Sequence, residues 1–194
     1  MAEQQKPSKK SGKKSESFQL RLFNQWLTEF SRESDRAAVI LGAAKLDLVI
    51  RELLVKKFLP NPSGQDELFD TDKPISSFSA RINVAYRLGL IDKQLANSLH
   101  LIRRIRNDFA HEAIGANLGA GSHRDRVKVL CAPFLKEKHF EALVSKTSSS
   151  RLSHASRYFR TVLTIIVVRL EGATLNTCVV DDEGAFGLVP PWSE

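Results

Sequence analysis

The sequence predicts an all-α protein, a single helical bundle of about five to seven helices. Apolar residues recur at helical spacing in several segments, and serine, aspartate, glycine or proline residues stand between them, as at helix ends. Residues 37–58 are apolar around most of the helix circumference, as expected for a helix at the centre of a bundle. A chain of 194 residues is long enough for one domain with a substantial core. We therefore expect a disordered, lysine-rich tail over residues 1–17, a helical bundle over residues 18–172 and an irregular tail over residues 173–194.

The first two helices are expected over residues 18–30 and 37–58. The first segment is short and amphipathic, with its apolar residues at helical spacing. Ser34 and Asp35 can cap the second helix, because short oxygen-bearing side chains accept hydrogen bonds from the free amide groups at a helix start. The prolines and glycine of residues 60–64 end this helix and open a polar loop.

Four further elements are expected along the rest of the chain. A short helix over residues 76–89 should begin at a serine and close at a glycine, and the next, over residues 92–115, should begin at an aspartate cap. A short element over residues 127–135 is broken by a proline. The last strong helix is expected over residues 153–171. Its β-branched residues would suit a strand, but the length of the segment and its helical neighbours favour a helix.

The net charge of +7 favours a polyanionic partner only weakly, since the first 17 residues contain five lysines and two glutamates. Within this tail, four lysines are candidates for contact with nucleic acid: Lys9, Lys10, Lys13 and Lys14. The alternative is that the tail is a solubilising, disordered arm. The charge does not decide between the two.

Composition also predicts the compartment and the absence of several kinds of site. No apolar run is long enough to cross a bilayer, and no secretory signal follows the first lysines. Cys131 and Cys178 are expected to be free, buried thiols in a reducing cytoplasm. Four histidines lack the spacing of a metal site: His100, His123, His139 and His154. No glycine-rich phosphate loop is present either, so we expect no metal and no cofactor.

The most informative segment is the end of the helix over residues 92–115, where an arginine falls on the apolar face. With a step of about 100° per residue, Arg106 lies inside the stripe between Ile102 and Phe109. An unpaired buried guanidinium is costly, so Arg106 should have either a carboxylate partner or a function. Asp47 on the central helix is the first candidate partner, and Glu52 is the alternative. In that interpretation Arg106 holds two helices in register.

The same segment also has the chemistry of a phosphate-cleaving site. Arg106 stays charged, and its planar fork matches phosphate oxygens. His111 can act as a general base or acid in RNA cleavage without metal, as histidine side chains commonly do. Asn107 can orient the histidine or bond a phosphate oxygen. Alternatively, His111 is an ordinary histidine at a helix C-terminus, favoured there by the helix dipole.

One geometric condition limits the catalytic hypothesis. Arg106 and His111 are five positions apart, so on an uninterrupted helix their directions differ by about 140°. Either the helix loosens near Ala110, or the pair from one chain meets its mate across a two-fold axis. The second arrangement requires a homodimer.

Residues 74–91 and the helix that follows resemble the mannitol-operon-repressor (MtlR) family. The residues that carry the resemblance are Ser-Phe-Ser-x-Arg at 77–81 and Leu-Gly-x-Ile at 88–91, and the similarity extends over about residues 35–115. The resemblance implies a small helical bundle without a recognisable DNA-binding element. It also implies a repressor that acts through a protein partner.

The Arg-Asn-x-x-x-His run from Arg106 to His111 resembles the HEPN superfamily, whose active members are metal-independent ribonucleases that act as dimers. This resemblance implies that Arg106, Asn107 and His111 are catalytic. Two hypotheses therefore stand: an MtlR-like regulatory protein, and a HEPN endoribonuclease such as a toxin or defence effector. Direct, sequence-specific DNA binding has little support, because no expected helix has the exposed basic face of a major-groove reader.

Overall fold

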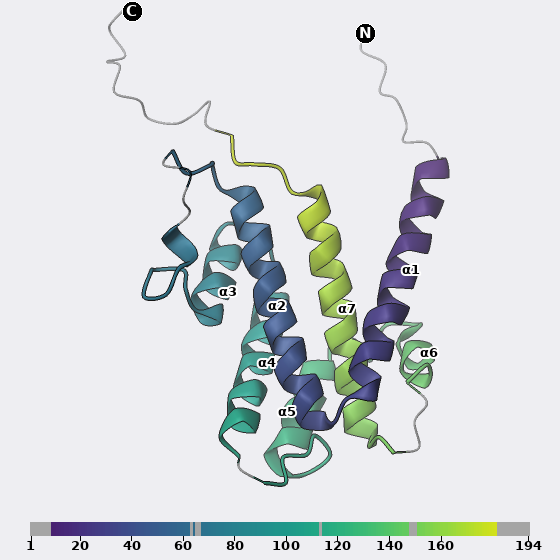
Figure 1. Ribbon diagram of the computed structural model, residues 1–194. Coiled ribbons are helices and arrows are strands. Elements are labelled where there is room, and N and C mark those ends of the chain that lie inside the picture. The colour runs from purple at the N-terminus through teal and green to yellow at the C-terminus, as the bar shows by residue number, and fades with distance from the viewer. Residues whose placement is uncertain (1–8, 63, 65–66, 113, 148–150, 182–194) are drawn as a thin grey trace, which may run out of the picture.

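The computed structural model describes residues 9–62, 64, 67–112, 114–147 and 151–181, and side chains from residue 18 onward. This part of the chain contains seven α-helices and a 3₁₀ turn, with no strand (Figure 1). The predicted all-α bundle is confirmed. In chain order the elements are α1 (Lys9–Arg32), α2 (Asp35–Lys57), η1 (Glu67–Phe69), α3 (Phe78–Arg87), α4 (Lys93–His111), α5 (Gly121–Cys131), α6 (Phe140–Ser145) and α7 (His154–Asn176).

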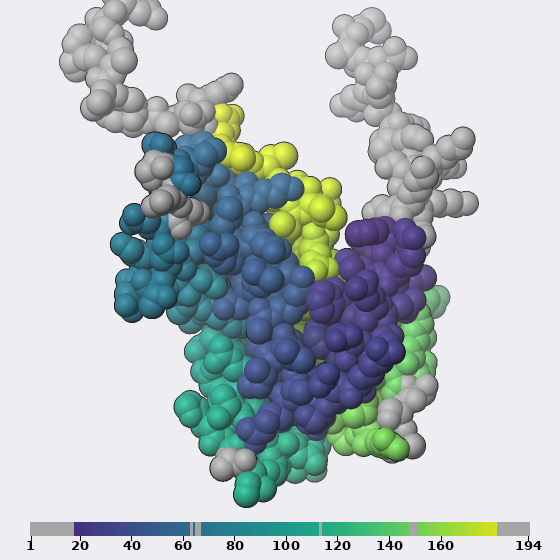
Figure 2. Space-filling view, viewed as in Figure 1, coloured from purple at the N-terminus to yellow at the C-terminus, as the bar shows by residue number. Residues whose placement is uncertain are grey.

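Helix α2 is the centre of the bundle, as its apolar circumference predicts. It packs against α3, α4 and α7, and its Leu46, Val49 and Ile50 are fully buried. Helix α1 packs mainly on α7 and makes only a small contact with α2. In the space-filling view α1, α2 and part of α7 lie beside one another across the face that is shown (Figure 2). One side of α2 is therefore left facing solvent.

The helix ends follow the local capping signals. The side chains of Ser34, Ser77, Asp92 and Ser153 each accept a hydrogen bond from an amide group in the first turn of the following helix. Gly89, with φ of +69°, follows α3 and turns the chain into α4. The predicted starts of α2, α3 and α4 are confirmed.

Helices α1 and α6 differ from expectation. Helix α1 begins at Lys9 rather than at Phe18. The prediction missed this earlier start because the first part of the helix is lysine- and serine-rich and lacks apolar periodicity. Helix α6 was not predicted. It has six residues, too few to show a period, and it is anchored by the buried side chains of Phe140 and Val144.

Helix α7 is longer than predicted and continues past Glu171 to Asn176. Its last turn is held by Lys56, whose Nζ donates to the carbonyls of Thr174 at 2.7 Å and Leu175 at 3.0 Å. A cation at this position satisfies carbonyls that have no partner within the helix and is attracted by the helix dipole. Although α7 is strongly apolar, none of the described helices is both long and apolar enough to cross a membrane.

Candidate functional sites around helix α4

The Arg-Asn-x-x-x-His run occupies the end of α4. Arg106 and Asn107 are half-buried, and His111 is exposed. Arg106 Nη1 donates to Asn107 Oδ1 at 3.1 Å. The helix remains regular at Ala110 and through His111, so it does not loosen as one alternative required. Arg106 and His111 therefore point in directions about 140° apart and cannot act on one phosphate within a single chain.

The prediction that Asp47 or Glu52 pairs with Arg106 is wrong. Asp47 Oδ1 accepts a hydrogen bond from Arg81 Nη1 at 2.8 Å, and Glu52 is exposed. Among the described residues Arg106 forms no ion pair. Arg81 takes Asp47 because α3 packs directly on α2, and its guanidinium also donates to two carbonyls of the preceding loop. The sequence carried a signal for this pair, because helical spacing places Arg81 on the same face of α3 as Phe78 and Ile82. That face is buried in the structure.

Other residues at the end of α4 pack against α5. Phe109 is fully buried, with its ring centroid 4.7 Å from that of His123. Glu112 Oε1 lies 2.6 Å from His123 Nε2, and Asp108 forms an ion pair with Arg126. These contacts join the end of α4 to α5. They leave the half-buried Arg106 and Asn107 and the exposed His111 outside the packed interface.

Arg36 fixes the end of α4 against the start of α2. Its Nη1 donates to the carbonyl of Phe109 at 2.8 Å, and its Nη2 donates to the carbonyl of Glu112. Carbonyls in the last turn of a helix lack partners within the helix, and a cation there is also attracted by the helix dipole. Sequence reasoning did not single out Arg36, because the contact joins residues far apart in the chain. The helix end that carries the candidate motif is therefore held against the start of α2.

The surface beside the motif is cationic. Arg103 is half-buried and Arg104 is exposed. Burial, and then the charges of Arg103 and Arg104, lower the pKa of His100 below its usual value. The His100 ring nitrogen Nε2 lies 3.0 Å from Asn83 Oδ1 on α3. Burial and these two positive charges hold His100 toward its neutral form.

A groove runs beside the N-terminal half of α4. It consists of two adjoining cavities of about 660 Å³ and 410 Å³, which share Gln94, Ser98 and Pro133. Charged residues Lys93, Glu137 and Arg169 also line it. Its apolar lining comes from α4, α5, α6, α7 and the loops between them: Leu90, Leu95, Leu101, Val129, Phe134, Leu143 and Ile165. We refer to these two cavities as the α4 groove.

The α4 groove does not contain a recognisable catalytic or metal-binding arrangement. None of Arg106, Asn107 and His111 lines either cavity. In the part of the chain that the structure describes, no three His, Cys, Asp or Glu side chains are grouped so that they could hold a metal ion. The groove is open and largely apolar, which suits the surface of another molecule.

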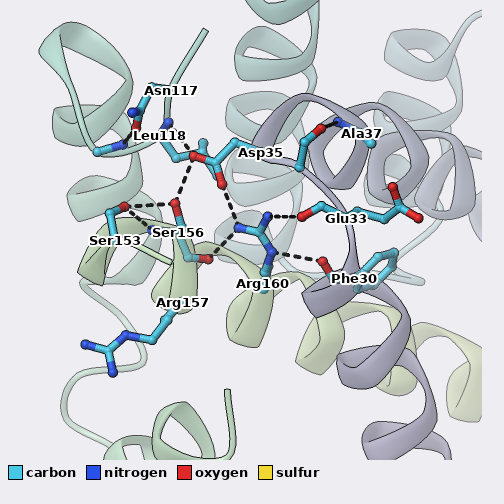
Figure 3. A network of polar contacts seen from close by, with 12 residues as sticks. Phe30, Glu33, Asp35, Ala37, Asn117, Leu118, Ser153, Ser156, Arg157 and Arg160 are labelled. Atoms are coloured by element: carbon cyan, nitrogen blue, oxygen red, sulfur yellow. Dashed lines mark hydrogen bonds and ion pairs between the residues drawn. The ribbon is translucent and has the colours of Figure 1, made fainter. Parts of the chain in front are cut away.

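A second polar cluster lies inside the bundle, at Arg160 of α7 (Figure 3). Arg160 is fully buried, and its Nη1 donates to Asp35 Oδ1 at 2.8 Å. Its Nε donates to the carbonyl of Phe30 at 2.9 Å, its Nη2 to that of Glu33 at 2.9 Å, and Nη1 also to that of Ser156 at 3.2 Å. Each guanidinium nitrogen therefore has a partner from the protein.

The carboxylate of Asp35 is equally well satisfied. Its Oδ2 accepts hydrogen bonds from the Leu118 amide at 3.0 Å and from Ser156 Oγ at 2.8 Å. The cluster thus joins the end of α1, the start of α2, α7 and the loop before α5. With these partners already in place, we interpret it as a structural network. Asp35 was expected only as a helix cap, and Arg160 was not singled out.

Two other predictions concern the cysteines and the tail. Cys131 is buried, and burial raises the pKa of its thiol to about 12. Cys178 is exposed, so the expectation that both thiols are buried is wrong for Cys178. It lies just beyond the end of α7, where the chain has left the core. The side chains of the candidate nucleic-acid-binding lysines lie outside the described residues, although their backbone belongs to α1: Lys9, Lys10, Lys13 and Lys14.

A solved structure that resembles this chain is the X-ray structure of the MtlR–HPr complex from Escherichia coli. The TM-score is 0.61 and the identity is 19%, over 77% of this chain and 98% of that chain. The chain has an MtlR-like fold. No protein-family model matches the sequence, and no curated protein matches it. The MtlR resemblance is therefore confirmed for the fold, and the comparison gives no support to the HEPN resemblance.

Proposed function

We propose that this chain is an MtlR-like regulatory protein, a repressor that acts by binding a protein partner in the α4 groove. The observation that carries the proposal is the groove itself, which combines an apolar lining with charged residues of both signs. Protein interfaces have this composition, with an apolar centre and a polar rim. The similar MtlR structure is described as a complex with another protein, HPr, which supports the same kind of function.

The arrangement of α4 argues against direct reading of DNA. This helix carries Arg103, Arg104 and Arg106, yet it packs against α2, α3 and α5. A recognition helix must expose one long face that fits the major groove. A protein partner, rather than a DNA sequence, is therefore the proposed target. We place the protein and its partner in the cytoplasm.

Substitution of Val129 by glutamate should weaken partner binding by at least about tenfold, or roughly 1.4 kcal/mol. Val129 lines the α4 groove and is 66% exposed, so the change introduces an unpaired charge into the interface without disturbing the core. Isothermal titration with HPr, together with capture from extract of the source cells, measures the effect. The bound protein is then identified by mass spectrometry.

Leu135→Glu is the matched control for this experiment. Leu135 is 54% exposed and lies outside the lining of the groove. The Leu135→Glu variant should bind the partner as the wild type does, and both variants should retain the wild-type melting temperature. Equal binding by wild type and both variants, or equal loss in both variants, would contradict the assignment of the groove.

A second candidate function is metal-independent RNA cleavage, and one observation favours it. Arg106 is not engaged by a carboxylate among the described residues, and His111 is exposed, so both side chains are available to a ligand. In this function Arg106 stabilises charge on the phosphate, Asn107 orients Arg106, and His111 transfers the proton. Because the two key residues point about 140° apart, the site requires residues from two copies of the chain.

For this second function, His111→Ala should reduce RNA cleavage in EDTA by about 100-fold or more while stability is unchanged. Arg106→Ala should have a similar effect on cleavage and cost little stability, because Arg106 is half-buried and hydrogen-bonded to its neighbour Asn107. Gel assays with several labelled RNAs measure cleavage. His100→Ala, on the same helix, is the control and should remain active. A well-folded wild type that cleaves none of these RNAs would eliminate this function.

A further inference from the structure

The α4 groove contains a buried hydroxyl group that the rest of the described chain does not bind. Ser98 is only 8% exposed, and it lines both cavities of the groove. Among the described residues its Oγ has no hydrogen-bond partner, whereas Leu95, Leu101 and Phe134 make the lining around it apolar. Buried polar groups are normally hydrogen-bonded. A molecule that fills the groove should therefore combine an apolar body with one hydrogen-bonding group.

Residues 182–194, which follow the described part of the chain, have a composition that fits this groove. Two consecutive prolines favour the extended polyproline II conformation, which docks in grooves lined by aromatic side chains. A tryptophan follows the prolines, and its side chain has an apolar body with one N–H donor. The segment places four large apolar residues within seven positions: Phe186, Leu188, Val189 and Trp192.

The described chain ends close to one end of the α4 groove. The amide of Val180 donates to the carbonyl of Lys57 at 2.7 Å, at the end of α2 that also holds the last turn of α7. Ala173, in the preceding turn of α7, lines the groove. An extended chain covers about 3.3 Å per residue, so the stretch from Val180 to Trp192 reaches up to roughly 40 Å. Along α7 the groove extends from Ala173 to Ile165, about 12 Å, so the segment is long enough to fill it.

We propose that residues 185–192 of this chain occupy the α4 groove, and that a protein partner must displace them before it can bind. In this arrangement the Trp192 ring lies against the apolar lining, and its indole N–H donates to Ser98 Oγ. The inference adds regulation to the proposed function, and it rests on that function for taking the groove as the partner site. A groove that is closed in most molecules binds its partner with an affinity lowered by the fraction that is open.

The fluorescence of Trp192 tests whether the segment is seated. The chain has two tryptophans, Trp26 and Trp192, so the difference in emission between wild type and Trp192→Phe reports on Trp192. An indole in apolar surroundings emits at shorter wavelength than one in water. The difference emission should be blue-shifted, and its quenching by acrylamide should be at least about threefold weaker than that of a synthetic peptide of residues 182–194, because a pocket covers most of its ligand's surface. Emission and quenching equal to those of the peptide would overturn the proposal.

A groove variant and a matched control locate the seat. Val129 and Ser98 line the same cavity, so Val129→Glu should give Trp192 the emission and quenching of the free peptide. Leu135→Glu adds the same charge outside the groove and should leave the wild-type signal unchanged. If Val129→Glu left Trp192 seated, the segment would not be in this groove. A signal that disappears on dilution would assign the seat to the segment of a second copy and overturn the proposal.

Removal of residues 182–194 separates the failure of this inference from the failure of the proposed function. The chain truncated after Asp181 should bind HPr about tenfold more tightly than wild type in isothermal titration, since its groove is always open. Equal affinities of the two chains would overturn the inference while the proposed function stands. If neither chain bound HPr although Trp192 was seated in wild type, the seat would stand and HPr would not be the partner. Circular dichroism should show the same helix content in both chains.

Discussion

Arg160→Met is expected to lower the free energy of unfolding by about 3–5 kcal/mol, because it leaves the largely buried carboxylate of Asp35 without its cation. Asp35 would lose its ion pair at 2.8 Å, and the carbonyls of Phe30 and Glu33 would lose their donors. Methionine matches the aliphatic stem of arginine, so the loss reports mainly on the polar contacts. Denaturant unfolding followed by circular dichroism measures the change.

Arg169→Met is the control, because Arg169 is exposed on the same helix. It should change stability by no more than about 0.5 kcal/mol. The double variant Asp35→Asn with Arg160→Met should lose less than the two single variants together, since both residues belong to one network. If Arg160→Met were as stable as Arg169→Met, the cluster in Figure 3 would not hold the bundle together.

Gly42→Ala should lower the free energy of unfolding by about 1–3 kcal/mol. This direction is opposite to the intrinsic preference, because alanine in a helix is better than glycine by about 1 kcal/mol. A Cβ atom at Gly42 would overlap Leu163 Cδ2 on α7. Leu163 is fully buried, so its methyl group cannot move into solvent. The same denaturant experiment measures the loss.

Gly172→Ala is the matched comparison for the substitution at Gly42. Among the described residues its Cβ would meet only Gln19 Nε2, at 3.6 Å, so this change should be neutral or stabilising by up to about 1 kcal/mol. In a Leu163→Ala background, Gly42→Ala should cost less than in the wild type, because the clashing methyl groups are gone. A full penalty in that background would show that the close approach of α2 and α7 is not its cause.

The helix starts could be predicted from the sequence because capping is local. A serine or aspartate accepts a hydrogen bond from an amide two or three positions later, so Ser34, Ser77 and Asp92 carried enough information. The apolar stripe of α4 was equally predictable, and Ile102 and Phe109 are fully buried. Six-residue α6 had no such signal, and neither did the first turns of α1.

The partners of charged residues could not be predicted in the same way. Asp47 was expected to bind Arg106, but α3 places Arg81 beside it. Likewise, the Asp35–Arg160 pair joins residues 125 positions apart. Which cation reaches a carboxylate depends on how helices pack in space. Spacing within one helix does not contain that information.

The sequence by itself determined the helices, their caps, the all-α class and the chemical types at the end of α4. Only the tertiary structure decided which groups meet, such as Asp47 with Arg81 and Arg36 with a carbonyl at the end of α4. The physical reason is the distance along the chain over which each kind of interaction acts. Helix propensity and capping act over three or four residues, whereas ion pairs, grooves and exposed faces arise from packing between segments far apart in the chain.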